Sequence, residues 1–115
     1  MTKYSMVLIC CFVTLLAATI VFAQGLNVQP QAITVSQINT VPNKTYVTLT
    51  GNITQAVGRE YYTFRDSTGE ITIEIERKVW GGITVGPSDH VEITAEVEIK
   101  RGGRIEVEAK MVKKI

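Results

Sequence analysis

Residues 61–75 predict a β-hairpin, and the sequence itself specifies how its two strands pair. Polar and apolar side chains alternate on both sides of Asp66-Ser67-Thr68-Gly69, so each strand has one apolar face and one polar face. Asp at the first position and Gly at the fourth are favoured in a type I turn. The alternation then predicts four facing pairs: Phe64 with Ile71, Tyr62 with Ile73, Arg65 with Glu70, and Tyr61 with Glu74. A shift of one residue would expose the isoleucines, which argues against any other register.

Residues 1–23 have the pattern of a secretory signal peptide. Lys3 supplies the positive charge, residues 6–22 are uncharged and mostly apolar, and cleavage is expected after Ala23. A retained membrane anchor is the alternative, but an apolar run of about 17 residues is at the short end for a bilayer span, and no stop-transfer charges follow it. Cys10 and Cys11 lie inside this segment, so they predict neither a disulfide nor a metal site. We expect an exported protein without stable membrane insertion after cleavage.

The processed chain is neutral by formal charge. Lys3 is one of the 12 basic residues, so 11 basic residues remain against 11 acidic ones. Affinity for nucleic acids comes mainly from clustered Lys and Arg that neutralise phosphates, and neutrality therefore argues against a nucleic-acid partner. Residues 24–115 suffice for one domain with a modest core.

The start of the processed chain predicts a leader and then a helix. Residues 24–33 contain a proline and several amides with no hydrophobic period, and they are expected to form a flexible leader. Thr34 and Gln37 match a capping box, which predicts a short helix over about residues 35–40.

Period-two alternation predicts further strands at residues 46–53, 91–100 and 105–111. Gly51 takes an inward position in the first of these and indicates a bend that lets one strand serve both halves of a sheet. The last two strands are joined by a three-residue loop at 101–103, with Gly103 left-handed. Ile99 and Met111 are predicted to face inward, while Val112 breaks the alternation and indicates a late bulge.

Residues 78–89 contain the only Trp, three glycines and Pro87, which predicts a structured loop rather than a helix. Trp80 is expected to plug one end of a barrel formed by the predicted strands. The alternative is an exposed stacking platform for sugars or bases.

One short helix followed by five strands predicts an all-β fold, a small five-stranded Greek-key barrel of the OB type over residues 34–115.

Several separated motifs resemble the bacterial OB-fold (BOF) proteins, small exported domains associated with stress tolerance. They are Val47-x-Leu49-x-Gly51-x-Ile53, Tyr62-Thr63-Phe64-Arg65-Asp66-x-x-Gly69, Trp80-x-Gly82, Pro87-x-Asp89-x-Val91 and Glu96-Val97. The resemblance spans residues 34–115 and implies a non-catalytic OB barrel in the periplasm of a Gram-negative bacterium. The chain departs from the family pattern at Ala95, where Gly is usual, and at the basic Lys100-Arg101 turn, which is often acidic in relatives.

The sequence offers no catalytic constellation and no cofactor site. His90 is the only histidine, no thiol follows residue 23, and spacing places no base beside the serines, so no nucleophile and base can be paired. A zinc site would need several His or Cys ligands. We expect no enzymatic activity, and we expect His90 to be a solvated surface residue.

The surface that OB barrels usually use for ligands is the outer side of the second and third strands. Here it presents the candidate ligand-binding residues Tyr61, Thr63, Arg65, Thr72 and Glu74, followed by Glu76, and Trp80 is a further candidate. One tyrosine and one arginine suit stacking and hydrogen bonding to a sugar or peptide, while the carboxylates would repel a phosphate backbone. The alternative is that Arg65 only pairs with Glu70 and Tyr61 only covers the sheet.

A second candidate lies on the final hairpin. The alternation places Glu98 opposite Glu106 and Glu96 opposite Glu108, so four carboxylates form a ladder on its outer face. This ladder is either a solvated acidic face or a weak site for a hard divalent cation such as calcium.

Two functions follow from these patterns together with the family resemblance, which alone implies the periplasm and stress tolerance. The first is a monomeric periplasmic binding module that supports envelope stress tolerance through a small ligand, a cell-wall fragment or a partner protein. The second is a single-stranded nucleic-acid-binding OB domain, which would require retention in the cytoplasm and a basic strand face.

Overall fold

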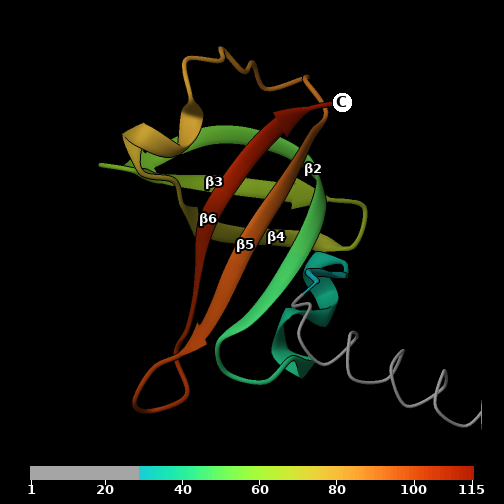
Figure 1. Ribbon diagram of the computed structural model, residues 1–115, viewed down its shortest axis with the longest axis vertical. Coiled ribbons are helices and arrows are strands. Elements are labelled where there is room, and N and C mark those ends of the chain that lie inside the picture. The colour runs from blue at the N-terminus through green and yellow to red at the C-terminus, as the bar shows by residue number, and fades with distance from the viewer. Residues whose placement is uncertain (1–28) are drawn as a thin grey trace, which may run out of the picture.

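The computed structural model describes residues 29–115, so the predicted signal peptide and the first half of the predicted leader lie outside the described residues. The elements are β1 (Gln31–Ala32), η1 (Val35–Thr40), β2 (Thr45–Gly58), β3 (Tyr61–Asp66), β4 (Gly69–Glu74), η2 (Arg77–Trp80), β5 (Val91–Ile99) and β6 (Ile105–Lys114). The strands form one six-stranded sheet in the order β1-β2-β3-β4-β6-β5, and a further β2–β5 pairing closes it (Figure 1). The five long strands are the predicted OB-type barrel, and no helix in the described part of the chain has the length and apolar character to cross a membrane.

The β3–β4 hairpin has the register that the sequence predicts, including all four expected pairs. Asp66 stabilises the turn because its Oδ1 accepts the backbone N–H groups of Thr68, at 2.7 Å, and Gly69, at 3.2 Å. Phe64 and Ile73 are fully buried in the barrel, as the predicted inward face requires. The hairpin is therefore the part of the fold that local sequence specifies most completely.

Strand β2 belongs to both halves of the barrel. Residues 45–51 pair with β5, and residues 52–58 pair with β3. Gly51 lies at the change of partner, where an added Cβ would overlap the carbonyl oxygen of Arg65 and lie 2.9 Å from the Phe64 ring. The predicted bend is thus a point of close backbone approach. The strand is also longer than expected, since residues 57 and 58, predicted as a connection, still belong to it.

Helix η1 is a 3₁₀ helix that is anchored by the β3–β4 turn. The predicted reciprocal contact is present, because Gln37 Oε1 accepts the Thr34 N–H at 2.9 Å. The next two free N–H groups are satisfied from the hairpin: Val35 donates to Asp66 Oδ2 at 2.8 Å, and Ser36 donates to Thr68 Oγ1 at 3.0 Å.

Partial burial acts to raise the pKa of Asp66, but hydrogen bonds from Thr68, Val35 and Gly69 outweigh it and lower the pKa below its usual value. Its ionised carboxylate therefore contributes stability above the unfolded-state pKa, and this contribution is lost as the pH falls through the folded-state pKa.

Four local expectations are wrong. Part of the predicted flexible leader is ordered, because Gln31 and Ala32 pair in parallel with β2. Residues 77–80, which overlap the loop expected to be free of helix, form a 3₁₀ turn. Ile99 is 40% exposed because it lies at the end of β5 beyond the packed core. Met111 is 58% exposed because the expected bulge falls at residue 110 in β6, and Val112 takes the inward position.

We expect Gly51→Val to lower the free energy of unfolding by about 2–4 kcal/mol, because the new side chain forces β2 and β3 apart at their closest approach. Gly58→Val is the matched control in the same strand, since its Cβ would find ordinary contacts of 3.6 Å. Arg65→Ala removes only an exposed ion pair with Glu70 and should change stability by less than about 1 kcal/mol. Urea melts with equal midpoints for all three variants would contradict the close approach.

Candidate functional site

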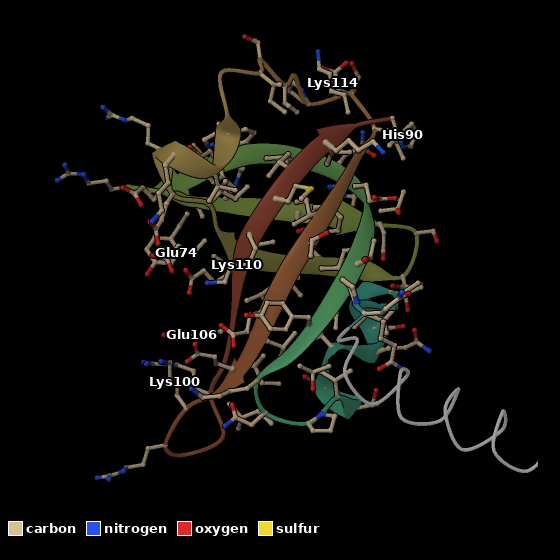
Figure 2. All side chains as sticks on the ribbon, in the orientation of Figure 1. Glu74, His90, Lys100, Glu106, Lys110 and Lys114 are labelled. Atoms are coloured by element: carbon tan, nitrogen blue, oxygen red, sulfur yellow. The ribbon has the colours of Figure 1, made fainter. Side chains whose placement is uncertain are left out.

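A groove opens where β4 and β6 separate. The two strands run parallel but meet at one pair, Glu74 with Glu108, and in Figure 1 the first half of β6 runs away from β4. The groove has a volume of about 280 Å³ and is lined by Tyr61, Thr72, Glu74, Glu98, Lys100, Ile105, Glu106, Val107 and Glu108. Residues from the predicted hairpin site and from the predicted carboxylate ladder therefore line one cavity. Figure 2 shows Glu74, Lys110, Glu106 and Lys100 along this side of the barrel.

The hairpin wall carries an exposed tyrosine and a destabilised carboxylate. Tyr61 is 44% exposed and faces Glu74 across the β3–β4 ladder. Partial burial raises the pKa of Glu74, and the neighbouring negative charge of Glu108 raises it further. Among the described residues, Glu74 has no basic side chain within ion-pair distance.

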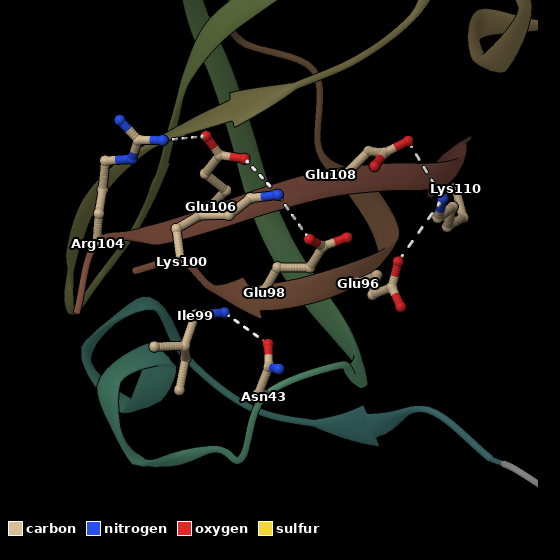
Figure 3. A network of polar contacts seen from close by, with 9 residues as sticks. All are labelled: Asn43, Glu96, Glu98, Ile99, Lys100, Arg104, Glu106, Glu108 and Lys110. Atoms are coloured by element: carbon tan, nitrogen blue, oxygen red, sulfur yellow. Dashed lines mark hydrogen bonds and ion pairs between the residues drawn. The ribbon is translucent and has the colours of Figure 1, made fainter. Parts of the chain in front are cut away.

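The opposite wall is the carboxylate ladder, and the cross-strand pairs Glu98–Glu106 and Glu96–Glu108 form as the sequence predicts. Lys100 Nζ lies 2.9 Å from Glu98 and 3.6 Å from Glu106 (Figure 3). Hydrogen bonding to Lys100 lowers the pKa of Glu98, and the same contact raises the pKa of Lys100.

Two more cations complete the network. Arg104 lies 3.2 Å from Glu106, and Lys110 lies 3.2 Å from Glu108 and 3.9 Å from Glu96. The hydrogen bond to Glu108 raises the pKa of Lys110 despite partial burial. Three cations thus face a ladder of four carboxylates, and Glu74 adds a fifth carboxylate at its edge.

One oxygen from each of Glu96, Glu98 and Glu108 can lie within 4.8 Å of the others, a spacing that could suit a divalent cation. Glu106 is not part of this group. Each of these three carboxylates is also ion-paired with a lysine, which a cation would have to displace. Cation binding to the ladder therefore stays a prediction.

Three predicted ligand-binding residues lie away from the groove. Thr63 belongs to the outer face of β3 but does not line the cavity, and Arg65 pairs with Glu70 at 2.7 Å beside a separate, open hollow. Trp80 lines another hollow, where its ring packs edge-on against Tyr62 with centroids 5.3 Å apart. It is half-buried against the core, as the barrel-plug interpretation expects. His90 is exposed, as expected.

Sequence reasoning missed Lys100, Ile105 and Val107 as groove residues. The inward alternation of Ile105 and Val107 marked them as core, and the only available signal was their position in the strand next to the ladder. Since the groove depends on a contact between β4 and β6, which are distant in the sequence, no local pattern predicts it.

The described lining of the groove is acidic and carries one aromatic ring. Its described lining holds carboxylates, one lysine, a phenol and a hydroxyl, but no histidine, cysteine or serine to form a nucleophile–base pair. Of its four glutamates, three are ion-paired with Lys100, Arg104 and Lys110, and Glu74 is not paired among the described residues. The Tyr61 ring offers an apolar surface.

The chain is similar to known bacterial proteins. Residues 17–114 match the model of the family described as bacterial OB fold (BOF) protein. Protein YgiW of Escherichia coli K12 is 38% identical over 82 residues, which are 71% of this chain and 62% of that protein. An uncharacterized protein of Haemophilus influenzae is 39% identical over 69 residues, or 60% of this chain and 57% of that protein. The chain thus spans about three-fifths of the length of these relatives.

Solved structures agree on the fold. The structure of the hypothetical protein YgiW from E. coli superposes with a TM-score of 0.69 at 35% identity, covering 74% of this chain and 90% of that one. A chain of the S. pombe Stn1-Ten1 complex superposes with a TM-score of 0.60 at 13% identity, covering 75% and 76%. At that identity the second likeness concerns the fold alone.

We expect Glu74→Gln to raise the midpoint of thermal unfolding at pH 7. The corresponding gain in the free energy of unfolding should be at most about 1 kcal/mol, because solvent screens these charges. The raised pKa means that ionised Glu74 disfavours folding above the unfolded-state pKa, and that the penalty disappears as the pH falls and the group takes up a proton. The gain should therefore be absent near about pH 3. Glu70→Gln, which removes an ion-paired carboxylate from the same strand, should give no gain at either pH.

We expect about 5 mM calcium, enough to fill a typical extracellular calcium site, to leave Tm unchanged, because lysines already neutralise the ladder. Melts with calcium and with chelator measure this. A calcium-dependent rise in Tm that Glu98→Gln abolishes would instead make the ladder a cation site.

Proposed function

Because the chain belongs to the bacterial OB-fold (BOF) protein family, we propose that it is an exported, non-catalytic binding module of the bacterial periplasm. It acts as a monomer and supports envelope stress tolerance. Its ligand is a small molecule, a cell-wall fragment or a segment of a partner protein, held in the groove between the β3–β4 hairpin and the β5–β6 hairpin. The signal-peptide pattern of residues 1–23 supports export.

The position of the groove carries this proposal. OB barrels bind their ligands on the outer face of their second and third strands, beside the loops that join the first to the second strand and the fourth to the fifth. In this chain these elements are β3, β4, the β2–β3 turn and the β5–β6 loop. Tyr61, Thr72 and Lys100 line the groove among them. The cavity is therefore at the surface where the architecture presents ligands.

The charge of the groove argues against single-stranded nucleic acid. A phosphate backbone needs a basic track, and stacked bases need exposed aromatic rings. The groove offers one lysine among four glutamates, and Tyr61 is its single aromatic residue. Electrostatics thus favours a neutral or cationic ligand over DNA or RNA.

Chemical-shift mapping tests the proposal directly. The ¹⁵N-labelled domain, residues 24–115, is titrated with soluble muropeptides released from cell walls and, separately, with a labelled oligothymidine followed by fluorescence anisotropy. We expect muropeptide-dependent shifts at Tyr61, Thr72 and Ile105, and no salt-sensitive, submicromolar complex with the oligonucleotide.

Tyr61→Ala should weaken muropeptide binding by about tenfold, since it removes the only ring in the groove. Tyr46→Ala is the matched control, an exposed tyrosine on β2 that does not line the groove. Shifts confined to another face would reject the groove as the site, and tight oligonucleotide binding would replace the proposal by the nucleic-acid function.

A further inference from the structure

One side of β6 is an unpaired sheet edge. β6 pairs with β5 along its length, from Ile105 opposite Ile99 to Lys114 opposite Val91. On its other side, Glu108 with Glu74 is the only pair found within residues 29–115. The first half of β6 therefore has no strand beside it on the groove side, as Figure 1 shows.

The main-chain groups of this edge point into the groove. The Lys100 N–H donates to the Arg104 carbonyl at 2.7 Å, so the backbone of Arg104 faces β5. In an antiparallel ladder the next residue turns its N–H and C=O the other way, and Ile105 and Val107 therefore direct theirs away from β5. Since Glu108 itself faces β5, its parallel pair with Glu74 uses the Val107 C=O, which leaves the N–H and C=O of Ile105 and the N–H of Val107 for a further strand. Both residues line the groove. Such a row of donors and acceptors is a template for one more strand.

The side chains beside this edge select by charge. Glu106 and Glu108 project from β6 to the outside, and Glu74 lies next to Glu108. Opposite charges on neighbouring strands stabilise a sheet and like charges destabilise it. Glu106 pairs with Arg104 and Lys100, and Glu108 pairs with Lys110, whereas Glu74 has no ion-pair partner among the described residues. A second copy of this chain would bring more glutamates to this edge, whereas a strand with basic side chains on its outer face would compensate Glu74. Partial burial raises the pKa of Glu74, and the neighbouring charge of Glu108 raises it further.

We propose that the free edge of β6 binds an extended peptide segment with alternating basic and apolar residues, which adds to the barrel as a β-strand. The basic side chains lie on the outer face beside Glu106, Glu108 and Tyr61, and the apolar ones lie on the opposite face beside Ile105. This inference rests on the proposed function, because it names the occupant of the same groove as a segment of a partner protein.

A fluorescent seven-residue peptide of alternating lysine and valine, acetylated and amidated at its ends, tests strand addition. Two further versions carry N-methyl groups on the lysine amides or on the valine amides. Only one of these sets faces the protein edge in an added strand. We expect one methylated version to bind about tenfold more weakly than the parent and the other to bind as the parent does. Equal binding of both versions would overturn strand addition in favour of simple charge attraction.

Protein variants and mapping locate the peptide. Glu106→Gln should weaken binding by about threefold, in the range of exposed ion pairs, while Glu92→Gln, a partly exposed glutamate on β5 outside the groove, should not. A peptide with glutamate in place of lysine should not bind. Amide shifts at Ile105 and Val107 support the inference, and shifts confined elsewhere overturn it.

Two outcomes separate this inference from the proposed function. Muropeptide shifts in the groove without binding of the lysine–valine peptide would leave the proposed function in place and reject strand addition. A concentration-dependent dimer in sedimentation experiments that the peptide cannot dissociate would make a second copy the occupant and would also reject it.

Discussion

The barrel depends on the close approach of two backbones at Gly51. There β2 leaves β5 and takes β3 as its partner, and the carbonyl of Arg65 occupies the space that any larger residue would need for its Cβ. The same crossing brings the Phe64 ring against Gly51 and lets one strand seal both halves of the core. The position of the hairpin, and therefore of the groove wall that it carries, follows from this contact.

At the groove, strand pairing and electrostatics oppose each other. Within the closed sheet, β4 and β6 are joined by one parallel pair, and both members of that pair are glutamates, so this contact brings like charges together. Lys100 and Lys110 relieve the repulsion along the ladder, but Glu74 remains uncompensated among the described residues. Proteins commonly tolerate such local destabilisation at sites that bind ligands. The electrostatic penalty and the unpaired edge of β6 occur at the same place.

Local pattern predicts much of this fold and six of the nine groove residues, but it does not predict that these residues line one cavity. Alternation is sufficient for the hairpin register and for the pairing of Glu98 with Glu106, because these partners are joined by short turns. It fails at Met111, where a one-residue bulge reverses the faces, and at Gln31, where a two-residue parallel strand has too few residues to show a period. The meeting of Glu74 with Glu108 depends on barrel closure, and sequence spacing carries no information about that.

From the hydrogen bonds of η1 to Asp66 and Thr68 we expect the β3–β4 hairpin to form before the helix. A tight hairpin closes rapidly because its contacts are local, whereas η1 obtains the acceptors for its first N–H groups only after the β3–β4 turn exists. The hairpin therefore acts as the template on which η1 forms. Val35 and Ile38 still hold η1 to the core, so acid should loosen the start of the helix rather than release it, because it protonates the carboxylate that anchors the first N–H groups. The amides of Val35 and Ser36 should then exchange with solvent before those of the barrel strands.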